Sequence, residues 1–226
     1  MEKDKEYYSF LTLPDEKSPT GEAYRALRTN ILRVTQDKSI KAILITSANH
    51  YEGKTTTAIN LALAMSDVPQ FRMLLVDSDL RYPTIHSRLG LMQSPGLTEI
   101  LEGNVDLDSG MINTEKENLK VITSGNLLSY PAELLESERL KDLINVLKSR
   151  FDLILVDSPP VVPYSDASVL SSRVDGVLLV VQSGKTRQED LQQVYATLRD
   201  NQANVLGVVL NKQKDFVPSR IYKRQL

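Results

Sequence analysis

Apolar residues gather in short, nearly unbroken runs that are separated by longer polar segments. Six such runs stand out, at 42–45, 73–76, 119–122, 153–156, 177–181 and 205–210. Continuous apolar runs of this length are typical of strands covered on both faces, as in parallel sheets. We therefore expect six buried strands.

Between most of these runs the apolar positions recur with helical spacing. The spacing predicts helices over 20–34, 55–65, 132–147 and 188–198. Alternating strands and helices form right-handed crossovers, so we predict an α/β fold: a three-layer sandwich with a mostly parallel central sheet flanked by helices. Ligands of such sheets bind at the carboxyl ends of the strands, so the residues that follow each run are the candidates for chemistry.

Composition excludes several kinds of protein. The 226 residues carry 27 Lys and Arg against 29 Asp and Glu, a net charge of −2 that favours no nucleic-acid partner. The absence of cysteine excludes a disulfide framework, a thiolate zinc site and a cysteine nucleophile. No apolar run is long enough to span a bilayer, and the N-terminus lacks the pattern of a secretory signal. We expect a cytoplasmic protein.

The length suits one large α/β domain. We expect an irregular N-terminal arm over 1–19, because it is charged and interrupted by prolines. The domain is predicted to span 20–211 and to begin with a helix at 20–35. A basic C-terminal tail would occupy 212–226.

The residues after the first run have the layout of a phosphate-binding P-loop, in which a loop ending Gly53-Lys54-Thr55 joins a strand to a helix. In such a loop the main-chain N–H groups at the helix start face phosphates, Lys54 supplies a cation, and the Thr55 hydroxyl ligates Mg²⁺. Ala48 replaces the first glycine of the strict motif. A helix start merely capped by its threonines is the alternative interpretation.

Aspartates end two more of the apolar runs. Asp77 and Asp79 follow the second run, and Asp157 follows the fourth. A carboxylate at the end of a buried strand is costly to desolvate unless it meets a cation or hydrogen-bond donors. Together with Lys54 and Thr55, the three aspartates indicate a Mg²⁺ site beside the phosphates.

These segments resemble a known family. The runs 43–55, 74–83 and 153–160 look like the Walker A, A′ and B motifs of the bacterial tyrosine kinases, the cytoplasmic autokinases of capsule and exopolysaccharide export. The similarity extends over most of the chain, from about residue 18 to 211. It implies an ATP-dependent protein-tyrosine autokinase that regulates capsular or exopolysaccharide biosynthesis and export.

The resemblance also implies roles for individual residues. Lys54, Asp77 and Asp79 would be catalytic, and Thr55, Asp77 and Asp157 would hold Mg²⁺. ATP would be bound by a set drawn from the loop and the last strand: Glu52, Gly53, Lys54, Thr55, Thr56 and Asn211, the last of which would face the adenine.

A fourth element resembles the family's oligomerisation helix. Glu22, Arg25 and Arg28 have the Glu-x-x-Arg-x-x-Arg spacing, which places all three charges on one helical face. The resemblance implies a homo-oligomeric ring formed through this helix. It also implies protein-tyrosine substrates and a separate membrane-anchored activator or polysaccharide co-polymerase, which would hold the kinase peripherally at the inner face of the cell membrane.

Two departures from the family pattern leave alternatives open. His50 and Tyr51 stand where the family loop has proline and glycine, and a tyrosine resists the positive φ that glycine accepts. The tail carries a lone tyrosine, Tyr222, as a candidate phosphoacceptor in place of a tyrosine cluster. Both departures favour a catalytically weakened regulatory subunit as one alternative. A partitioning or division ATPase is another, although Asn49 replaces the signature lysine of that class.

Overall fold

The computed structural model describes residues 18–38, 40–128 and 130–213. Seven strands form one sheet in the order β3-β4-β2-β5-β1-β6-β7. The strands are β1 (Ala42–Ser47), β2 (Met73–Asp77), β3 (Ile112–Asn113), β4 (Leu119–Ile122), β5 (Leu153–Asp157), β6 (Gly176–Gln182) and β7 (Val205–Asn211). All neighbouring pairs are parallel except β3 with β4.

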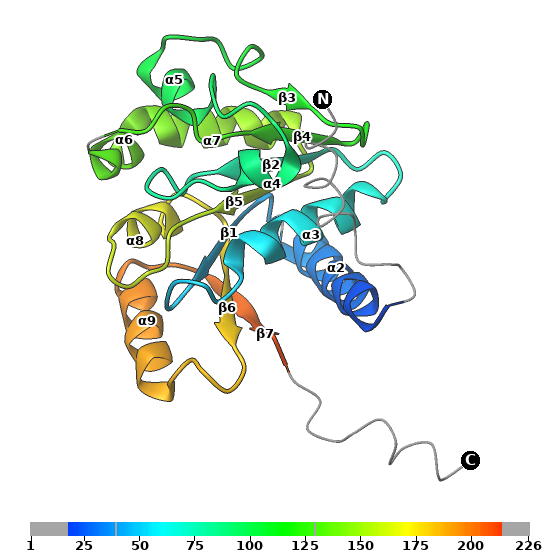
Figure 1. Ribbon diagram of the computed structural model, residues 1–226, viewed down its shortest axis with the longest axis vertical. Coiled ribbons are helices and arrows are strands. Elements are labelled where there is room, and N and C mark those ends of the chain that lie inside the picture. Colours follow the sequence, from blue (N-terminus) through cyan, green and yellow to red (C-terminus); the bar gives the residue numbers. More distant parts are fainter. Residues whose placement is uncertain (1–17, 39, 129, 214–226) are drawn as a thin grey trace, which may run out of the picture.

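Helices connect the strands and cover both faces of the sheet (Figure 1). The three longest after the first are α3 (Lys54–Ser66), α7 (Glu138–Arg150) and α9 (Gln188–Asp200). The first helix of the described residues is α2 (Pro19–Lys38), and the shorter ones are α4 (Ile85–Leu89), α5 (Leu97–Glu102), α6 (Pro131–Glu136) and α8 (Asp166–Ser171).

Two apolar cores make the predicted three-layer sandwich. Residues that alternate along the central strands divide between them: Leu44 faces one core, whereas Ile43 and Ile45 face the other, and all three are fully buried. The core around Leu44 includes residues of α5 to α9, and the core around Ile43 includes residues of α2, α3 and α4. Because both faces of the strands are covered, no alternation of polar residues is needed, which is why the strands read as unbroken apolar runs.

The structure confirms the fold class and all six predicted strands. One prediction was wrong in detail: the segment 132–147 is not a single helix. Ser137 has extended backbone at ψ 147° between α6 and α7, and its hydroxyl donates a hydrogen bond to the Leu134 carbonyl oxygen at 2.7 Å. The apolar periodicity continues across this break, so the pattern alone did not indicate it. The two-residue strand β3 also lacked a periodic signal.

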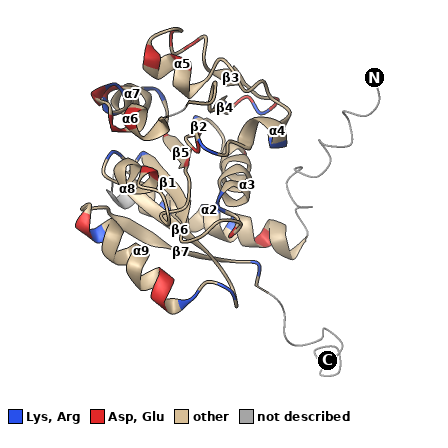
Figure 2. Ribbon diagram, turned by 60° about the vertical axis from the view of Figure 1, so that its left-hand side comes forward, with Lys and Arg blue, Asp and Glu red and all other residues tan. Residues whose placement is uncertain are grey.

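Charged residues are spread over the helices and loops, and most of the strands carry none (Figure 2). No helix in the described part of the chain is both long enough and apolar enough to cross a membrane. What remains polar inside the molecule lies mainly at the carboxyl ends of β1, β2 and β5, where the candidate site is found.

Candidate nucleotide-binding and phosphoryl-transfer site

Parallel pairing brings the predicted site residues together. Asp77, the last residue of β2, pairs in register with Asp157, the last residue of β5, and Asp157 also lies opposite Ile45 of β1. Because β1 continues into the loop that carries Lys54, three strand ends and one helix start converge at a single edge of the sheet. The aspartates are almost completely buried there: Asp77, Asp79 and Asp157 expose at most 3% of their surface.

The loop before α3 has the backbone of a phosphate cradle. Gly53 caps the helix in the left-handed region at φ 98°, and its carbonyl oxygen accepts the amide of Thr57 at 2.9 Å. Tyr51 also adopts positive φ, at 63°, although a side chain disfavours that conformation. The substitution of glycine by tyrosine therefore preserves the shape of the loop, and the Tyr51 side chain stands 86% exposed above it.

Contacts from β6, β7 and the β6–α9 loop hold this cradle in place. The buried carboxylate of Glu52 accepts the amide of Asn49 at 3.1 Å and the hydroxyl of Thr186, so Glu52 braces the loop from within. The side-chain amide of Asn211 donates to the Glu52 carbonyl oxygen at 2.9 Å. Lys212 donates to the Tyr51 carbonyl oxygen. The last strand thus fixes the first loop.

The three aspartate side chains differ in their hydrogen-bond and ion-pair partners. Asp79 forms an ion pair with Lys54, with 2.9 Å between Oδ2 and Nζ. Asp77 accepts the main-chain amides of Asp79 at 3.2 Å and Ile85 at 3.1 Å. Neither carboxylate oxygen of Asp157 has a hydrogen-bond partner of ordinary geometry among the described residues, although Thr55 is close enough to affect its titration. A buried carboxylate left in this way calls for a cation or a bound water.

Burial and mutual repulsion raise the proton affinity of these groups. Burial raises the pKa of Asp157 to about 6, against the opposing influence of Lys54 and Thr55. Burial and the charge of Asp157 raise the pKa of Asp77 well above its ordinary value. Burial lowers the pKa of Lys54, but the charges of Asp157, Asp79 and Asp77 outweigh it, so its pKa is raised and the ammonium stays charged.

The residues fit a magnesium ion that is shared with a nucleotide. Among the described residues no three His, Cys, Asp or Glu side chains form a complete metal site by themselves. Mg²⁺ beside nucleotides takes only one or two protein ligands and completes its octahedron with phosphate oxygens and water. The unpartnered oxygens of Asp157 and the adjacent hydroxyl of Thr55 can supply such a minimal protein set.

Aromatic rings border the site on the side of β2 and β5. The imidazole of His50 lies edge-on to the rings of Tyr82 and Tyr164, with centroid distances of 5.8 and 5.7 Å. Tyr82 and Tyr164 are 6.5 Å apart. We call these three side chains the aromatic wall. Arg81 lies 4.6 Å from the Tyr164 ring centroid and is held by an ion pair with the fully buried Asp166.

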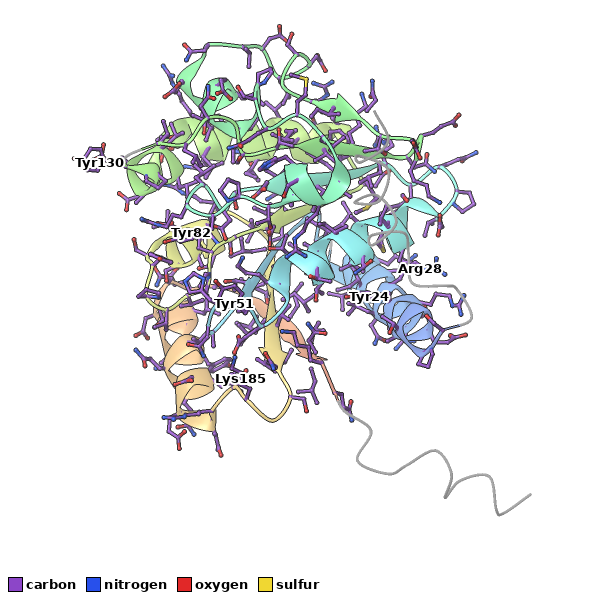
Figure 3. All side chains as sticks on the ribbon, in the orientation of Figure 1. Tyr24, Arg28, Tyr51, Tyr82, Tyr130 and Lys185 are labelled. Atoms are coloured by element: carbon purple, nitrogen blue, oxygen red, sulfur yellow. The ribbon has the colours of Figure 1, made fainter. Side chains whose placement is uncertain are left out.

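The predicted oligomerisation residues lie on α2, away from this site (Figure 3). Glu22 and Arg25 form an ion pair on the surface of the helix. Arg28 donates to the carbonyl oxygen of Ala64 on α3 at 3.0 Å, so this arginine also fastens α2 to the rest of the molecule. Tyr222 lies outside the described residues, and its role as a phosphoacceptor stays a prediction.

The sequence pattern missed the aromatic wall and the residues that brace the loop. Tyr82 lies in the segment that resembles the Walker A′ motif and Tyr164 follows the one that resembles Walker B, but neither tyrosine was assigned a role there. Thr186 and Asp190 gave no signal, although Asp190 accepts a hydrogen bond from the side chain of Asn49 at 3.2 Å. Their roles depend on contacts across more than 130 residues of sequence, which periodicity does not report.

The fold and the site together define a class of protein. A parallel α/β sheet, a glycine-capped loop ahead of a helix, one lysine and three buried carboxylates at the strand ends are the parts of a P-loop phosphoryl-transfer site. Comparison with known proteins narrows the class.

Residues 40–212 match the model of the AAA domain family. The tyrosine-protein kinase YwqD of Bacillus subtilis is 35% identical over 204 residues, which cover 90% of this chain and 86% of that protein. The tyrosine-protein kinase CpsD of Streptococcus pneumoniae is 39% identical over 195 residues, 84% of this chain and 83% of that one. The kinase domain of the Escherichia coli tyrosine kinase ETK has a TM-score of 0.84 at 30% identity, covering 93% of this chain and 83% of that domain. The chain belongs to the bacterial tyrosine-protein kinases.

Substitution of Gly53 by alanine tests the contact between the loop and the last strand. A Cβ at this position would lie 2.1 Å from Nδ2 of Asn211 and would sit on a backbone at φ 98°. We expect Gly53→Ala to lower the free energy of unfolding by about 1–3 kcal/mol from backbone strain, with a further loss from the collision. Urea denaturation measures both.

The matched control is Gly184→Ala, because Gly184 also has positive φ but nothing within 4 Å of the added Cβ. It should lose only the strain, about 1–2 kcal/mol. Equal losses of unfolding free energy in the two variants would show that the Asn211 side chain moves away from the added methyl group without destabilising the protein.

The titration of Asp157 predicts an unusual pH dependence. Between about pH 4 and 6 the folded protein holds a proton that the unfolded chain has released, so stability falls as the pH rises through this window. Without nucleotide and with EDTA, Asp157→Asn should therefore melt at a higher temperature than the wild type at pH 7.5. The gap should narrow toward pH 4.

Asp152→Asn is the opposite control. The hydrogen bond from Arg72 lowers the pKa of Asp152, so its removal should not stabilise the protein at pH 7.5. A difference in melting temperature between Asp157→Asn and the wild type that does not change with pH would contradict the raised pKa of Asp157.

Proposed function

We propose that this kinase transfers the γ-phosphoryl group of Mg·ATP to tyrosines of its own or neighbouring chains, and so regulates capsular or exopolysaccharide biosynthesis and export. The observation that carries the proposal is the convergence of Lys54 with Asp77, Asp79 and Asp157 at one edge of the sheet in a bacterial tyrosine-protein kinase. The polysaccharide connection rests on the resemblance of the whole set of motifs to the autokinases of those systems.

The residues of the site divide the work of phosphoryl transfer. The main-chain N–H groups from Gly53 to Thr56 cradle the phosphates at the start of α3, and Lys54 places its charge on the terminal ones. Thr55 and Asp157 would hold Mg²⁺, with Asp77 in support. The chemistry that bound Mg²⁺ supplies is neutralisation of charge on the transferring group. Asn211 stands on the β7 side of the loop, where we place the adenine.

Asp79 is the best candidate for orienting the acceptor hydroxyl. Its Oδ2 is paired with Lys54, whereas both oxygens of Asp77 accept main-chain amides. When Lys54 turns to the phosphates, Oδ2 of Asp79 becomes free to accept the proton of the attacking tyrosine. A bond then forms from the tyrosine oxygen to the γ-phosphorus, the bond to the β–γ bridging oxygen breaks, and ADP leaves with that electron pair.

The assembly that we propose is a ring. The face of α2 with Glu22, Arg25 and Arg28 would join one subunit to the next, since a head-to-tail interface closes only as a ring. A separate membrane-anchored activator or polysaccharide co-polymerase would hold the ring at the inner face of the cell membrane. Tyr222 in the basic tail would be one phosphoacceptor.

The comparisons favour a kinase over the two alternatives. The relatives are named tyrosine-protein kinases, which speaks against a partitioning or division ATPase. A weakened regulatory subunit was suggested by the residues at His50 and Tyr51 and by the lone Tyr222 of the tail, which lies outside the described residues. The positive φ of Tyr51 keeps the cradle intact, so the loop substitution is no longer a reason to prefer that alternative.

Substitution of Lys54 tests the catalytic proposal. Purified Lys54→Ala should form less than about 1% of the wild-type phosphotyrosine with Mg·ATP, because loss of a charged group at the transferring phosphate costs several kcal/mol of transition-state stabilisation. Phosphotyrosine and ADP are measured together, with and without the cytoplasmic peptide of a candidate activator. Lys185→Ala, which removes an exposed lysine in the β6–α9 loop, is the control.

The outcomes separate the three functions. Lys54-dependent phosphotyrosine supports the kinase, whereas ADP without phosphotyrosine supports an ATPase. Neither product, despite oligomer formation, supports a regulatory subunit.

Reversal of the charge of Arg25 tests the proposed interface. Arg25→Glu should shift the protein from ring to monomer in light scattering, because it places like charges beside Glu22 on the joining face. Arg28 is less suitable, since its contact with Ala64 also supports the fold. Lys141→Glu, on the exposed surface of α7, is the matched control. Rings of unchanged mass in the Arg25 variant would place the interface elsewhere.

A further inference from the structure

The aromatic wall of His50, Tyr82 and Tyr164 has no part in the chemistry described so far, although it stands next to it. All four ring contacts found among the described residues involve these side chains or the neighbouring Tyr51. Each member follows a strand that also supplies the phosphate site. His50 precedes Lys54 in the loop, Tyr82 follows Asp79, and Tyr164 follows Asp157. The wall is therefore anchored on the same strands as the catalytic groups.

Two hydrogen bonds tie the wall to the transferring end of the site. The amide of Tyr82 donates to Oδ1 of Asp79 at 3.0 Å, and Oδ2 of the same carboxylate meets Lys54 at 2.9 Å. Asp79 is thus shared between the phosphate-binding lysine and the backbone of the wall. The backbone of Tyr82 is thus fixed beside the carboxylate that we assign to the acceptor hydroxyl.

Buried charges hold the far side of the wall in position. Arg81 donates two hydrogen bonds to Asp166, at 2.6 and 3.0 Å, and Asp166 is fully buried. The Arg81 guanidinium then covers one face of the Tyr164 ring at 4.6 Å. Because Asp166 already holds Arg81 in place, the guanidinium restricts the Tyr164 ring at little further cost in side-chain entropy. The ring of Tyr164 is therefore ordered before a ligand binds.

The wall presents aromatic surface to solvent together with the neighbouring Tyr51. Tyr82 is 60% exposed, His50 and Tyr164 are half-buried, and Tyr51, whose ring centroid lies 6.0 Å from that of His50, is 86% exposed; in Figure 3 Tyr82 and Tyr51 lie on the same side of the molecule. Grouped exposed aromatics that border a polar site mark a binding surface more than scattered ones do. Tyrosine rings favour edge-to-face and offset contacts with a further ring.

We propose that the aromatic wall binds the ring of the acceptor tyrosine and thereby selects tyrosine over serine and threonine. The inference rests on the proposed kinase function. A tyrosine carries its hydroxyl at the far end of a flat ring, so contact of that ring with Tyr82 and Tyr164 directs the oxygen toward Asp79 and the γ-phosphorus. Serine and threonine offer no ring, and their hydroxyls lie close to the main chain. The wall is a positioning and specificity surface; it takes no proton and forms no bond.

Binding of three synthetic peptides tests the proposal without relying on turnover. The peptides are identical except for one position, which holds tyrosine, cyclohexylalanine or serine, and each carries a fluorescent dye. Fluorescence anisotropy gives their Kd for the full chain saturated with Mg²⁺ and a non-hydrolysable ATP analogue. We expect the tyrosine peptide to bind more tightly than both others, since serine has no ring and cyclohexylalanine has a ring of similar size but neither a π-face nor the hydroxyl.

Substitutions then assign the preference to the wall. Tyr82→Leu with Tyr164→Leu should weaken binding of the tyrosine peptide about two- to tenfold, to the level of the serine peptide. The Kd of the ATP analogue should change by less than about twofold, the scale of a few tenths of a kcal/mol. Tyr82→Phe keeps the ring and should keep the preference. Tyr195→Leu, on the exposed side of α9, is the matched control.

The affinities of the wild type and the variants for the three peptides support or overturn the proposal. Equal affinity of the wild type for the three peptides, or a tyrosine preference that survives in the double leucine variant, overturns the proposal. Should the double variant melt early, loss of preference in either single variant with unchanged affinity for the ATP analogue still supports it. A tyrosine preference in a protein that forms no phosphotyrosine would leave this inference standing and place the failure in the proposed catalysis.

Discussion

The site depends on an imbalance of charge at one edge of the sheet. Three buried carboxylates, Asp77, Asp79 and Asp157, surround the ammonium of Lys54, and among the described residues neither oxygen of Asp157 has a hydrogen-bond partner of ordinary geometry. Burying such groups costs free energy, which Lys54 and main-chain amides offset for Asp79 and Asp77 and which a bound cation or water would offset for Asp157. Burial without enough compensating contacts is also what raises the pKa of Asp157 to about 6.

The scaffold concentrates this charge by register. Parallel pairing of β2 with β5 sets Asp77 directly opposite Asp157, and the adjacent β1 delivers the loop that carries Lys54. A shift of one residue would turn one of these side chains into the apolar layer. The residues of the aromatic wall follow the same strands. The backbone hydrogen bonds of the sheet therefore position both the charged side chains and the aromatic rings.

Much of this arrangement was readable from the sequence, and the remainder was not for physical reasons. Unbroken apolar runs predicted the strands, and the residues after them predicted Lys54 and the aspartates, because the ends of parallel strands meet. The break at Ser137 was missed because apolar spacing continues through it. The bracing of Glu52 by Thr186 and the ring contacts of Tyr164 were missed because they arise from side chains that meet only after the layers have packed.

The bond between Asn211 and Glu52 joins residues that are 159 positions apart, and it has a consequence for the order of events during synthesis. The ribosome releases the phosphate loop well before the strand that secures it. A nascent chain can form β1 and α3 long before Asn211 exists, yet its loop lacks the amide that packs against Gly53. The loop therefore reaches its final, braced form only after β7 has been synthesised and has joined the sheet.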